Sequence, residues 1–265
     1  MRKEFERVHL ATEGNVAVVT LNHPEVLNAV SADMVRGLHA ALDEIERDDS
    51  GYRAVLLTGE GRAFCSGAYL SEAPANGAAA LSAGSILEEQ YYPLLRRLRD
   101  LRLPIVTAVN GGAAGVGMSL ALMGDIVIAG RSAYFLQAFS RIGLVPDGGS
   151  TWLLPRLVGL ARAKELSLLA EKLPAETASA WGLINRVCAD AALMDAAMNL
   201  ATQLAKGPTK ALALIRRLYW DSPQNSYEQQ LQSEREAQER AAATEDFREG
   251  LEAFRQKRPP EFRGR

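Results

Sequence analysis

The sequence predicts an α/β protein whose C-terminal part is helical. Short apolar runs rich in β-branched residues alternate with segments of helical periodicity up to about residue 150. Beyond that point almost every segment has helical periodicity alone, and glycine-rich turns separate the earlier elements. With 265 residues, 48% of them hydrophobic, the chain is long enough to bury a core without disulfides or structural metals.

Local patterns predict the individual elements. Ser31 is a typical helix N-cap residue, and the apolar residues that follow it as far as Ile45 share one helical face. Residues 71–84 consist largely of Ala, Gly, Ser and Pro, and are expected to form a loop. The apolar runs expected to be strands are 16–21, 54–58, 105–109, 126–129 and 133–136. The further helices expected are 85–101, 151–158, 160–170, 176–181, 190–206, 208–221 and 227–257.

A shift in composition near residues 190–200 divides the chain into two parts. Residues 1–195 are expected to form a core that holds the functional site, and residues 196–265 to form a helical C-terminal subdomain. The helix from Tyr227 to Ala243 is rich in Glu, Gln and Arg, so we expect it to face solvent or to pack against another subunit.

Composition and charge argue against several classes of protein. Thirty basic and 32 acidic residues leave a net charge of −2. The chain therefore lacks the excess of positive charge that is typical of nucleic-acid-binding proteins. Two cysteines build neither a disulfide framework nor a four-thiolate zinc site, and this favours a reducing cytoplasm. The sequence has no apolar signal core, no run near the roughly 18 apolar residues of a membrane span, and no metal-ligand spacing among its three histidines. We therefore expect a cytoplasmic protein that binds neither nucleic acid nor membrane nor metal.

Glycines cluster at residues 111–117, where an expected strand runs into an apolar helix. The third glycine of a dinucleotide-binding fingerprint is missing, and no Gly-Lys-Ser/Thr completes a P-loop. Two interpretations remain open. The turn either exposes backbone N–H groups at a helix N-terminus, where they stabilise negative charge, or it is only a tight packing turn.

Asp147 stands between an apolar run and a glycine pair that opens a helix. One interpretation is a helix N-cap, the usual role of an aspartate before a helix. The other is a carboxylate in an apolar pocket, made more basic by desolvation and able to carry a proton. Two possible nucleophiles are weaker candidates, because Cys65 has no histidine near it in the sequence and Ser66 lacks the G-x-S-x-G pattern.

Four segments in a fixed order carry a resemblance to a known family. They are LNHPEVLNAV at 21–30, AFCSGAYL at 63–70, AVNGGAAGVGMSLALMGDIVIA at 108–129 and FSRIGLVPDGGSTWLLPRLVG at 139–159. Together they resemble the crotonase superfamily, the enoyl-CoA hydratase/isomerase proteins, over essentially the whole chain. The closest subgroup is the ring-1,2-epoxyphenylacetyl-CoA isomerases of phenylacetate catabolism, which share the GLVPD-x-G-x-TWLLPR run.

The resemblance implies a crotonase-like spiral of repeated ββα units, followed by a helical region used for trimerisation. Two such trimers commonly stack as a hexamer. It also implies an acyl-CoA thioester as substrate, with coenzyme A as part of that substrate and no separate cofactor. The backbone N–H groups of Ala68 and Val116 match the family's oxyanion hole, which stabilises the enolate that develops on the thioester oxygen.

The positions of acids and bases decide the reaction that the resemblance implies. Family hydratases place two glutamates around a water, and the matching positions here are Ser119 and Phe139, which argues against efficient hydration. Asp147 matches the carboxylate of some family isomerases, which take a proton from one carbon and return it to another, and Phe139 is expected to keep that pocket dry. An acyl-CoA isomerase is thus the leading interpretation. The alternatives are a weak enoyl-CoA hydratase and a non-catalytic member that binds an acyl-CoA or a partner.

Tyr69 departs from the pattern, since most members have aspartate at this position. The family's aryl-CoA dehalogenases have tyrosine, but they need a histidine where this chain has Tyr92, so dehalogenation is disfavoured. Phe254 and Lys257 match residues that reach the nucleotide of a neighbouring subunit. The other substrate or coenzyme A contacts that the resemblance implies are Leu27, Ala63, Phe64, Ser66, Ala68, Tyr69, Val116 and Phe139.

Overall fold

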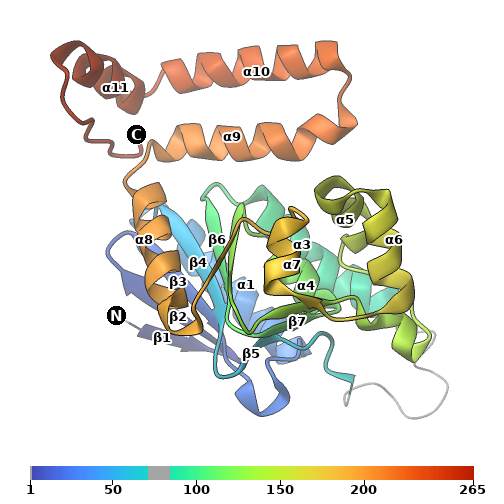
Figure 1. The fold of residues 1–265 in the computed structure, drawn as a ribbon. Coiled ribbons are helices and arrows are strands. Elements are labelled where there is room, and N and C mark those ends of the chain that lie inside the picture. Colours follow the sequence, from blue (N-terminus) through green and yellow to red (C-terminus); the bar gives the residue numbers. More distant parts are fainter. Residues whose placement is uncertain (1, 71–83) are drawn as a thin grey trace.

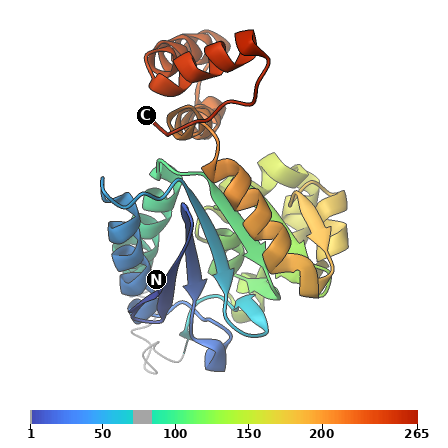
Figure 2. The ribbon, with the colours of Figure 1, turned by 90° about the vertical axis from the view of Figure 1, so that its left-hand side faces the viewer.

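The computed structural model describes residues 2–70 and 84–265, and the predicted α/β fold is confirmed. Two β-sheets and the helices packed around them form the body, and the last helices of the chain lie outside it as a separate layer (Figures 1 and 2). The loop expected over residues 71–84 falls outside the described residues, except for residue 84, which is helical.

The larger sheet has seven strands in the order β1-β2-β3-β4-β6-β8-β11. The strand β2 pairs antiparallel with both β1 and β3. From β3 onward every neighbouring pair of strands is parallel. Every residue of β4 and β6 is buried, which is why these strands are readable in the sequence as continuous apolar runs. The strands are β1 (Arg2–Phe5), β2 (Val8–Glu13), β3 (Val16–Leu21), β4 (Ala54–Gly59), β6 (Ile105–Val109), β8 (Ile126–Gly130) and β11 (Arg186–Cys188).

The smaller sheet has four short strands in the order β10-β9-β7-β5. They are β5 (Ala63–Cys65), β7 (Gly112–Ala114), β9 (Tyr134–Leu136) and β10 (Leu173–Pro174). Because β5 pairs with β7 in parallel, the segments that follow these two strands leave the sheet side by side. This sheet therefore sets the position of the residues described below.

Helices cover both faces of the larger sheet. On one face α8 packs against β3, β4, β6 and β8, while α1, α3, α4 and α5 contribute to the main core on the other face. The Oγ of Ser31 accepts a hydrogen bond from the Met34 N–H at 3.2 Å, which confirms the predicted N-cap of α1. The helices of the body are α1 (Ala32–Glu46), α3 (Tyr92–Asp100), α4 (Val116–Ala121), α5 (Ser150–Val158), α6 (Leu160–Leu169), α7 (Ala175–Ala180) and α8 (Leu193–Ala205). The π-helix η3 (Leu87–Tyr91) precedes α3, and the 3₁₀ helices are η1 (Pro24–Val26), η4 (Ala138–Ile142), η5 (Asp190–Ala192) and η6 (Ser222–Gln224).

The layer outside the body consists of α9 (Thr209–Asp221), α10 (Tyr227–Ala242) and α11 (Glu245–Gln256) (Figure 1). The single helix expected over 227–257 is wrong, because Thr244 begins a new helix by accepting a hydrogen bond from the Phe247 N–H at 3.0 Å. The expected division between residues 195 and 196 falls inside α8, which packs on the sheet, and the chain leaves the body only after that helix.

Arg216 joins the outer layer to the body. Its buried guanidinium donates to the Asp125 carboxylate at 2.5 Å, to the Leu98 carbonyl at 3.3 Å and to the Leu101 carbonyl. Burial raises the pKa of Asp125 even beside this cation. Removing the arginine would leave the partly exposed Asp125 carboxylate without its counter-charge, and the Leu98 and Leu101 carbonyls without this buried donor.

We expect Arg216→Ala to lower the free energy of unfolding by about 1–3 kcal/mol, because two carbonyls lose their buried donor and Asp125 loses its counter-charge. Arg217→Ala is the matched control. The Arg217 guanidinium forms ion pairs with Asp100 and Asp221 on the surface, and such pairs contribute about 0–1 kcal/mol. Urea unfolding followed by circular dichroism measures both losses. Equal losses in the two variants would contradict the role given to Arg216.

Candidate active site

Two turns from different strands meet in direct backbone contact. Gly67 has a φ of +104°, and a Cβ at this position would lie 3.0 Å from the Ala114 carbonyl oxygen and 3.8 Å from the Gly115 Cα. Only glycine combines this backbone angle with so close an approach. The turn after β5 and the turn after β7 therefore form one continuous surface.

Each of these turns presents a backbone N–H group without an acceptor in the described part of the chain. Val30 donates to the Gly67 carbonyl at 2.7 Å and accepts from the Tyr69 N–H at 3.0 Å, so the N–H of Ala68 faces the opposite side. Val116 is the first residue of α4, where an N–H group has no partner within the helix. The turn at residues 111–117 thus exposes an N–H group, and it is also tightly packed, since a Cβ at Gly117 would lie 2.4 Å from the Cys65 carbonyl oxygen.

Phe139 forms an apolar wall beside the second turn. It lies in η4 and is buried, and its ring Cζ would be 3.6 Å from a Cβ placed on Gly115. Gly115 directly precedes Val116 in the chain. Phe139 therefore lies close to the turn that carries the Val116 amide.

Asp147 caps no helix. The N-cap of α5 is Gly149, so the capping interpretation of this aspartate is wrong. Its Oδ1 atom is buried, and no hydrogen-bond donor among the described residues reaches it. Burial raises the pKa of the Asp147 carboxyl to about 6, because the charged form has lost water without gaining a partner.

The turn that carries Asp147 lies against α4. A Cβ on Gly148 would be 2.8 Å from the Cβ of Ser119 and 3.4 Å from the Cγ2 of Val116. Gly148 has a φ of +59°, which also favours glycine. The Asp147 carboxyl, whose pKa is raised, and the exposed N–H group of Val116 are thus held on adjoining elements.

Asp147 opens on a cavity of about 550 Å³ between α3, α5 and α9. The rings of Trp152 and Trp220 stack at one wall, with centroids 5.6 Å apart. Sequence reasoning missed both tryptophans, because Trp220 lies on the outer-layer helix α9 and only the folded chain brings it to α5. The other apolar lining residues are Tyr92, Leu95, Met123, Pro146 and Leu153, and the polar ones include Arg96, Arg99, Arg217, Asp221 and Gln224.

The residues expected to contact coenzyme A are only partly brought together. The Leu27 carbonyl accepts from the Ser66 N–H at 2.9 Å, so these two residues touch just before Ala68. Ala63 and Phe64 belong to β5, where the fully buried Phe64 ring leaves only backbone for a ligand. The half-buried ring of Tyr69 lies against His23, with centroids 5.7 Å apart.

Phe254 and Lys257 lie far from the other site residues within one chain. Phe254 is 82% exposed on α11, and Lys257 follows that helix with a φ of +55°. In Figure 1 α11 is the upper left end of the outer layer, whereas β5 and β7 lie low in the body.

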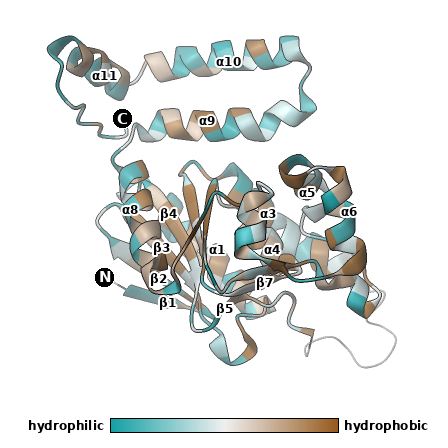
Figure 3. Ribbon diagram, in the orientation of Figure 1, coloured by the Kyte–Doolittle hydropathy of each residue, from teal (hydrophilic) through white to brown (hydrophobic). Residues whose placement is uncertain are grey.

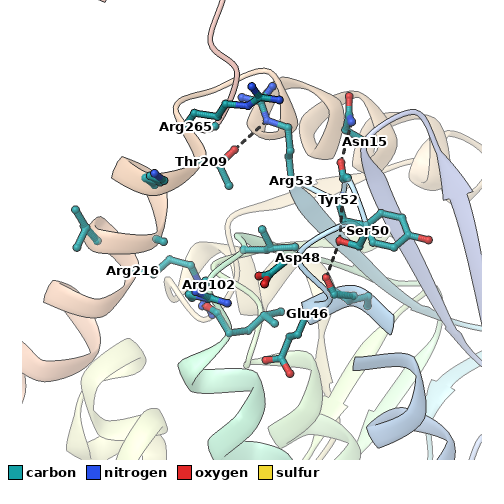
Figure 4. Close-up of a pocket in the computed structure, with 18 of the residues that line it drawn as sticks. Asn15, Glu46, Asp48, Ser50, Tyr52, Arg53, Arg102, Thr209, Arg216 and Arg265 are labelled. Carbon is teal, nitrogen blue, oxygen red and sulfur yellow. Dashed lines mark hydrogen bonds between the residues drawn. The ribbon is translucent and has the colours of Figure 1, made fainter. Parts of the chain in front are cut away.

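A larger cavity, of about 980 Å³, lies elsewhere, between the body and the outer layer of helices (Figure 4). Arg53 spans it, donating to Thr209 Oγ1 at 2.9 Å and to the carbonyls of Gly207 and Phe262. No residue expected in the site lines this cavity, so size alone does not identify the site. Its basic lining residues are Arg47, Arg53, Arg99, Arg102, Lys210, Arg216, Arg217, Arg240, Arg263 and Arg265.

Other chemistries find little support in residues 2–70 and 84–265. No group of His, Cys, Asp and Glu there is arranged to hold a metal ion. Burial raises the pKa of the Cys65 thiol to about 12, so this cysteine carries no thiolate at neutral pH. None of the described helices is both long and apolar enough for a membrane span.

Comparison with known proteins decides the family. The sequence model of the family described as enoyl-CoA hydratase/isomerase matches residues 11–265. The chain belongs to this family. It is accordingly an enzyme of the hydratase/isomerase group with the crotonase fold, and members of this group act on acyl-CoA thioesters.

Two curated relatives of this family are similar to nearly the same degree. A 1,2-epoxyphenylacetyl-CoA isomerase from Escherichia coli K12 is 47% identical over 99% of both chains. A protein named probable enoyl-CoA hydratase from Rhodobacter capsulatus is 46% identical over 98% of this chain and 99% of its own. Among solved structures, an enoyl-CoA hydratase from Bacillus anthracis is 30% identical and superimposes with a TM-score of 0.90 over 98% of this chain and all of that one.

Proposed function

We propose that this enzyme is an acyl-CoA isomerase in which Asp147 carries the proton. The observation that supports this most is the half-buried Asp147 carboxyl, whose buried Oδ1 has no hydrogen-bond partner among the described residues and which is held next to the turn of Val116. Ser119 and Phe139 stand where family hydratases have their two glutamates, so Asp147 has no second carboxylate to help it position a water.

In the proposed reaction, the thioester oxygen accepts hydrogen bonds from the N–H groups of Ala68 and Val116. Asp147 takes a proton from the substrate, and the electron pair of the broken C–H bond moves into the thioester as an enolate. The protonated Asp147 then returns that proton to a different carbon, which leaves an isomer and the original carboxylate. Each donor of such an oxyanion hole contributes about 2.7–4 kcal/mol to the barrier reduction.

The substrate class follows from the cavity beside Asp147. Its volume of about 550 Å³ and its aromatic wall fit an unsaturated or aromatic acyl group. The E. coli relative, named for an epoxide of phenylacetyl-CoA, supports an arylacetyl-CoA thioester. We place coenzyme A along Leu27, Ala63, Phe64 and Ser66, with Tyr69 near its acyl end.

Hydration is the second candidate function. The relative from R. capsulatus named as a probable hydratase is nearly as similar as the isomerase. We also propose that the enzyme acts in the cytoplasm, because its proposed acyl-CoA substrates would be found there.

We predict that Asp147→Asn lowers isomerase turnover by about 10²–10⁴-fold, because the amide cannot accept the proton. Acyl-CoA affinity, measured by calorimetry, should stay close to that of the parent enzyme. For the parent, kcat should fall on the acidic side of an inflection near the Asp147 pKa of about 6, since the protonated carboxyl is no base. Exposed Asp195→Asn is the control, and unchanged turnover in Asp147→Asn would rule out this mechanism.

A panel of thioesters separates the candidate functions. We expect turnover of 3-hexenoyl-CoA or of the ring-1,2-epoxide of phenylacetyl-CoA, and hydration of crotonyl-CoA far slower than by a two-glutamate hydratase assayed in parallel. Product analysis by mass spectrometry distinguishes isomers, which keep their mass, from hydrates, which gain one water. Fast hydration would favour the hydratase, and binding of every thioester without any turnover would favour a non-catalytic member.

Exposed apolar side chains occur on two groups of elements. One group belongs to the outer layer, whose helices mix hydrophilic and hydrophobic residues along their length (Figure 3). One surface, on α9 to α11, carries Ile215, Tyr219, Tyr227, Leu231, Phe247, Leu251 and Phe254. The other, on η4, α5, α6 and their flanking turns, carries Ile142, Leu144, Val145, Leu157, Leu160, Leu168 and Leu169. Two unlike apolar surfaces on one chain favour head-to-tail contacts that close into a ring. We propose a trimer or a hexamer, in which Phe254 and Lys257 reach the coenzyme A of a neighbouring subunit.

Light scattering after gel filtration should give three or six times the chain mass of 28.7 kDa. Substituting Phe254 by Asp should weaken the assembly, because the exposed ring would lose its apolar contact, and should raise the KM for acyl-CoA. A monomeric parent protein with full activity would contradict the proposal.

A further inference from the structure

A buried cluster of polar side chains lies beneath the turn of Asp147. Ser119, Gln137 and Ser150 come from α4, from the residue before η4, and from the start of α5, and each is at most 1% exposed. The hydroxyl oxygens of Ser119 and Ser150 are 2.9 Å apart, and Gln137 Nε2 is 3.4 Å from Ser150 Oγ. Buried polar groups are costly unless they are paired, so the contacts of this cluster are informative.

The hydrogen bonds of this cluster converge on the main-chain carbonyl of Asp147. That oxygen accepts from Ser150 Oγ at 2.8 Å and from the Ser150 N–H at 3.0 Å, and Ser119 Oγ lies 3.3 Å from it. Gln137 Nε2 in turn donates to Ser150 Oγ. Side chains of α4 and α5 thus reach one carbonyl directly, and Gln137 reaches it only through Ser150. None of these bonds reaches the Asp147 carboxylate.

This arrangement solves a conflict between position and basicity. A hydrogen bond donated to a carboxylate would fix its position but would also stabilise the charged form and lower its pKa. Bonds to the carbonyl of the same residue hold the Cα in place without that loss. The carboxylate can then remain without a hydrogen-bond partner and still be held at a defined place.

We propose that Ser119 and Ser150 are positioning residues, which hold the Asp147 carboxylate at the reacting carbon by binding the backbone carbonyl of the same residue. The inference rests on the proposed function of Asp147 and goes beyond it. It gives Ser119 a role of its own at the position where family hydratases have a glutamate. The close packing requires glycine at position 148, since a Cβ on Gly148 would be 2.8 Å from the Ser119 Oγ.

The test compares Ser150→Ala with Ser167→Ala, which removes a similar hydroxyl-to-carbonyl bond in α6, from Ser167 Oγ to the Ala163 carbonyl at 2.9 Å. The probes are 3-hexenoyl-CoA and the ring-1,2-epoxide of phenylacetyl-CoA, whichever the parent enzyme converts faster. A displacement near 1 Å at a catalytic group lowers rates by up to about 100-fold, so we expect kcat to fall by about 10-fold or more in Ser150→Ala. KM should change little, the inflection of the pH profile should stay at its parental value, and Ser167→Ala should keep parental turnover.

A kcat of Ser150→Ala within about twofold of the parent, or a moved pH inflection, would overturn the proposal, since the serine would then be structural or act on the pKa. Ser150→Thr retains the hydroxyl and should recover most of the lost kcat. Thermal unfolding checks that each variant is folded at the assay temperature. If Ser150→Ala is unfolded there, Ser119→Ala provides a second, independent test, and we expect it also to lower kcat. Asp147→Asn is measured on the same substrate. If Asp147→Asn keeps parental turnover, the proposed function fails. If Asp147→Asn loses turnover while Ser150→Ala and Ser119→Ala keep full activity, only the positioning role is refuted.

Discussion

The backbone contact between Gly67 and the Ala114–Gly115 turn is the constraint on which the rest of the site depends. Two three-residue strands, β5 and β7, are paired, and the turns after them approach so closely that a Cβ on Gly67 would lie 3.0 Å from the Ala114 carbonyl oxygen. Gly117 adds a second contact of this kind, since it brings α4 against Cys65. Any side chain at these positions would separate the two turns and move the N–H groups of Ala68 and Val116 apart. The geometry of the candidate oxyanion hole therefore depends on glycine at positions 67 and 117 as much as on the residues that carry its N–H groups.

A carboxyl such as that of Asp147 is unfavourable for folding and informative about function. A buried group without a partner breaks the rule that buried polar atoms are hydrogen-bonded, and such exceptions concentrate at functional sites. The surrounding fold compensates nearby: the main-chain carbonyl of Asp147 is well bonded, and the adjoining serines are buried in mutual contact. A rigid backbone thus carries a side chain that is left free for chemistry.

Much of this architecture could be predicted because it depends on local patterns. The strands β3, β4 and β6 are buried apolar runs, and the cap of α1 at Ser31 is a short-range signal. Three-residue strands such as β5 carry too few residues for a pattern, and the break at Thr244 interrupts an otherwise continuous helical periodicity. Asp147 was found from its sequence context, but its capping role could be rejected only once the helix start at Gly149 was known.

Trp220 illustrates what local patterns cannot reveal, and it carries a consequence of its own. This tryptophan lies on α9, whose Arg216 ties it to the body, while Ile215 and Tyr219 of the same helix are exposed. One helix therefore forms a wall of the cavity beside Asp147 and also part of an apolar surface available to another subunit. Substitutions that adapt this helix to a new neighbour would alter the space for the acyl group, and the reverse also holds. Subunit association and substrate range would then evolve together in this enzyme, because they share a single helix.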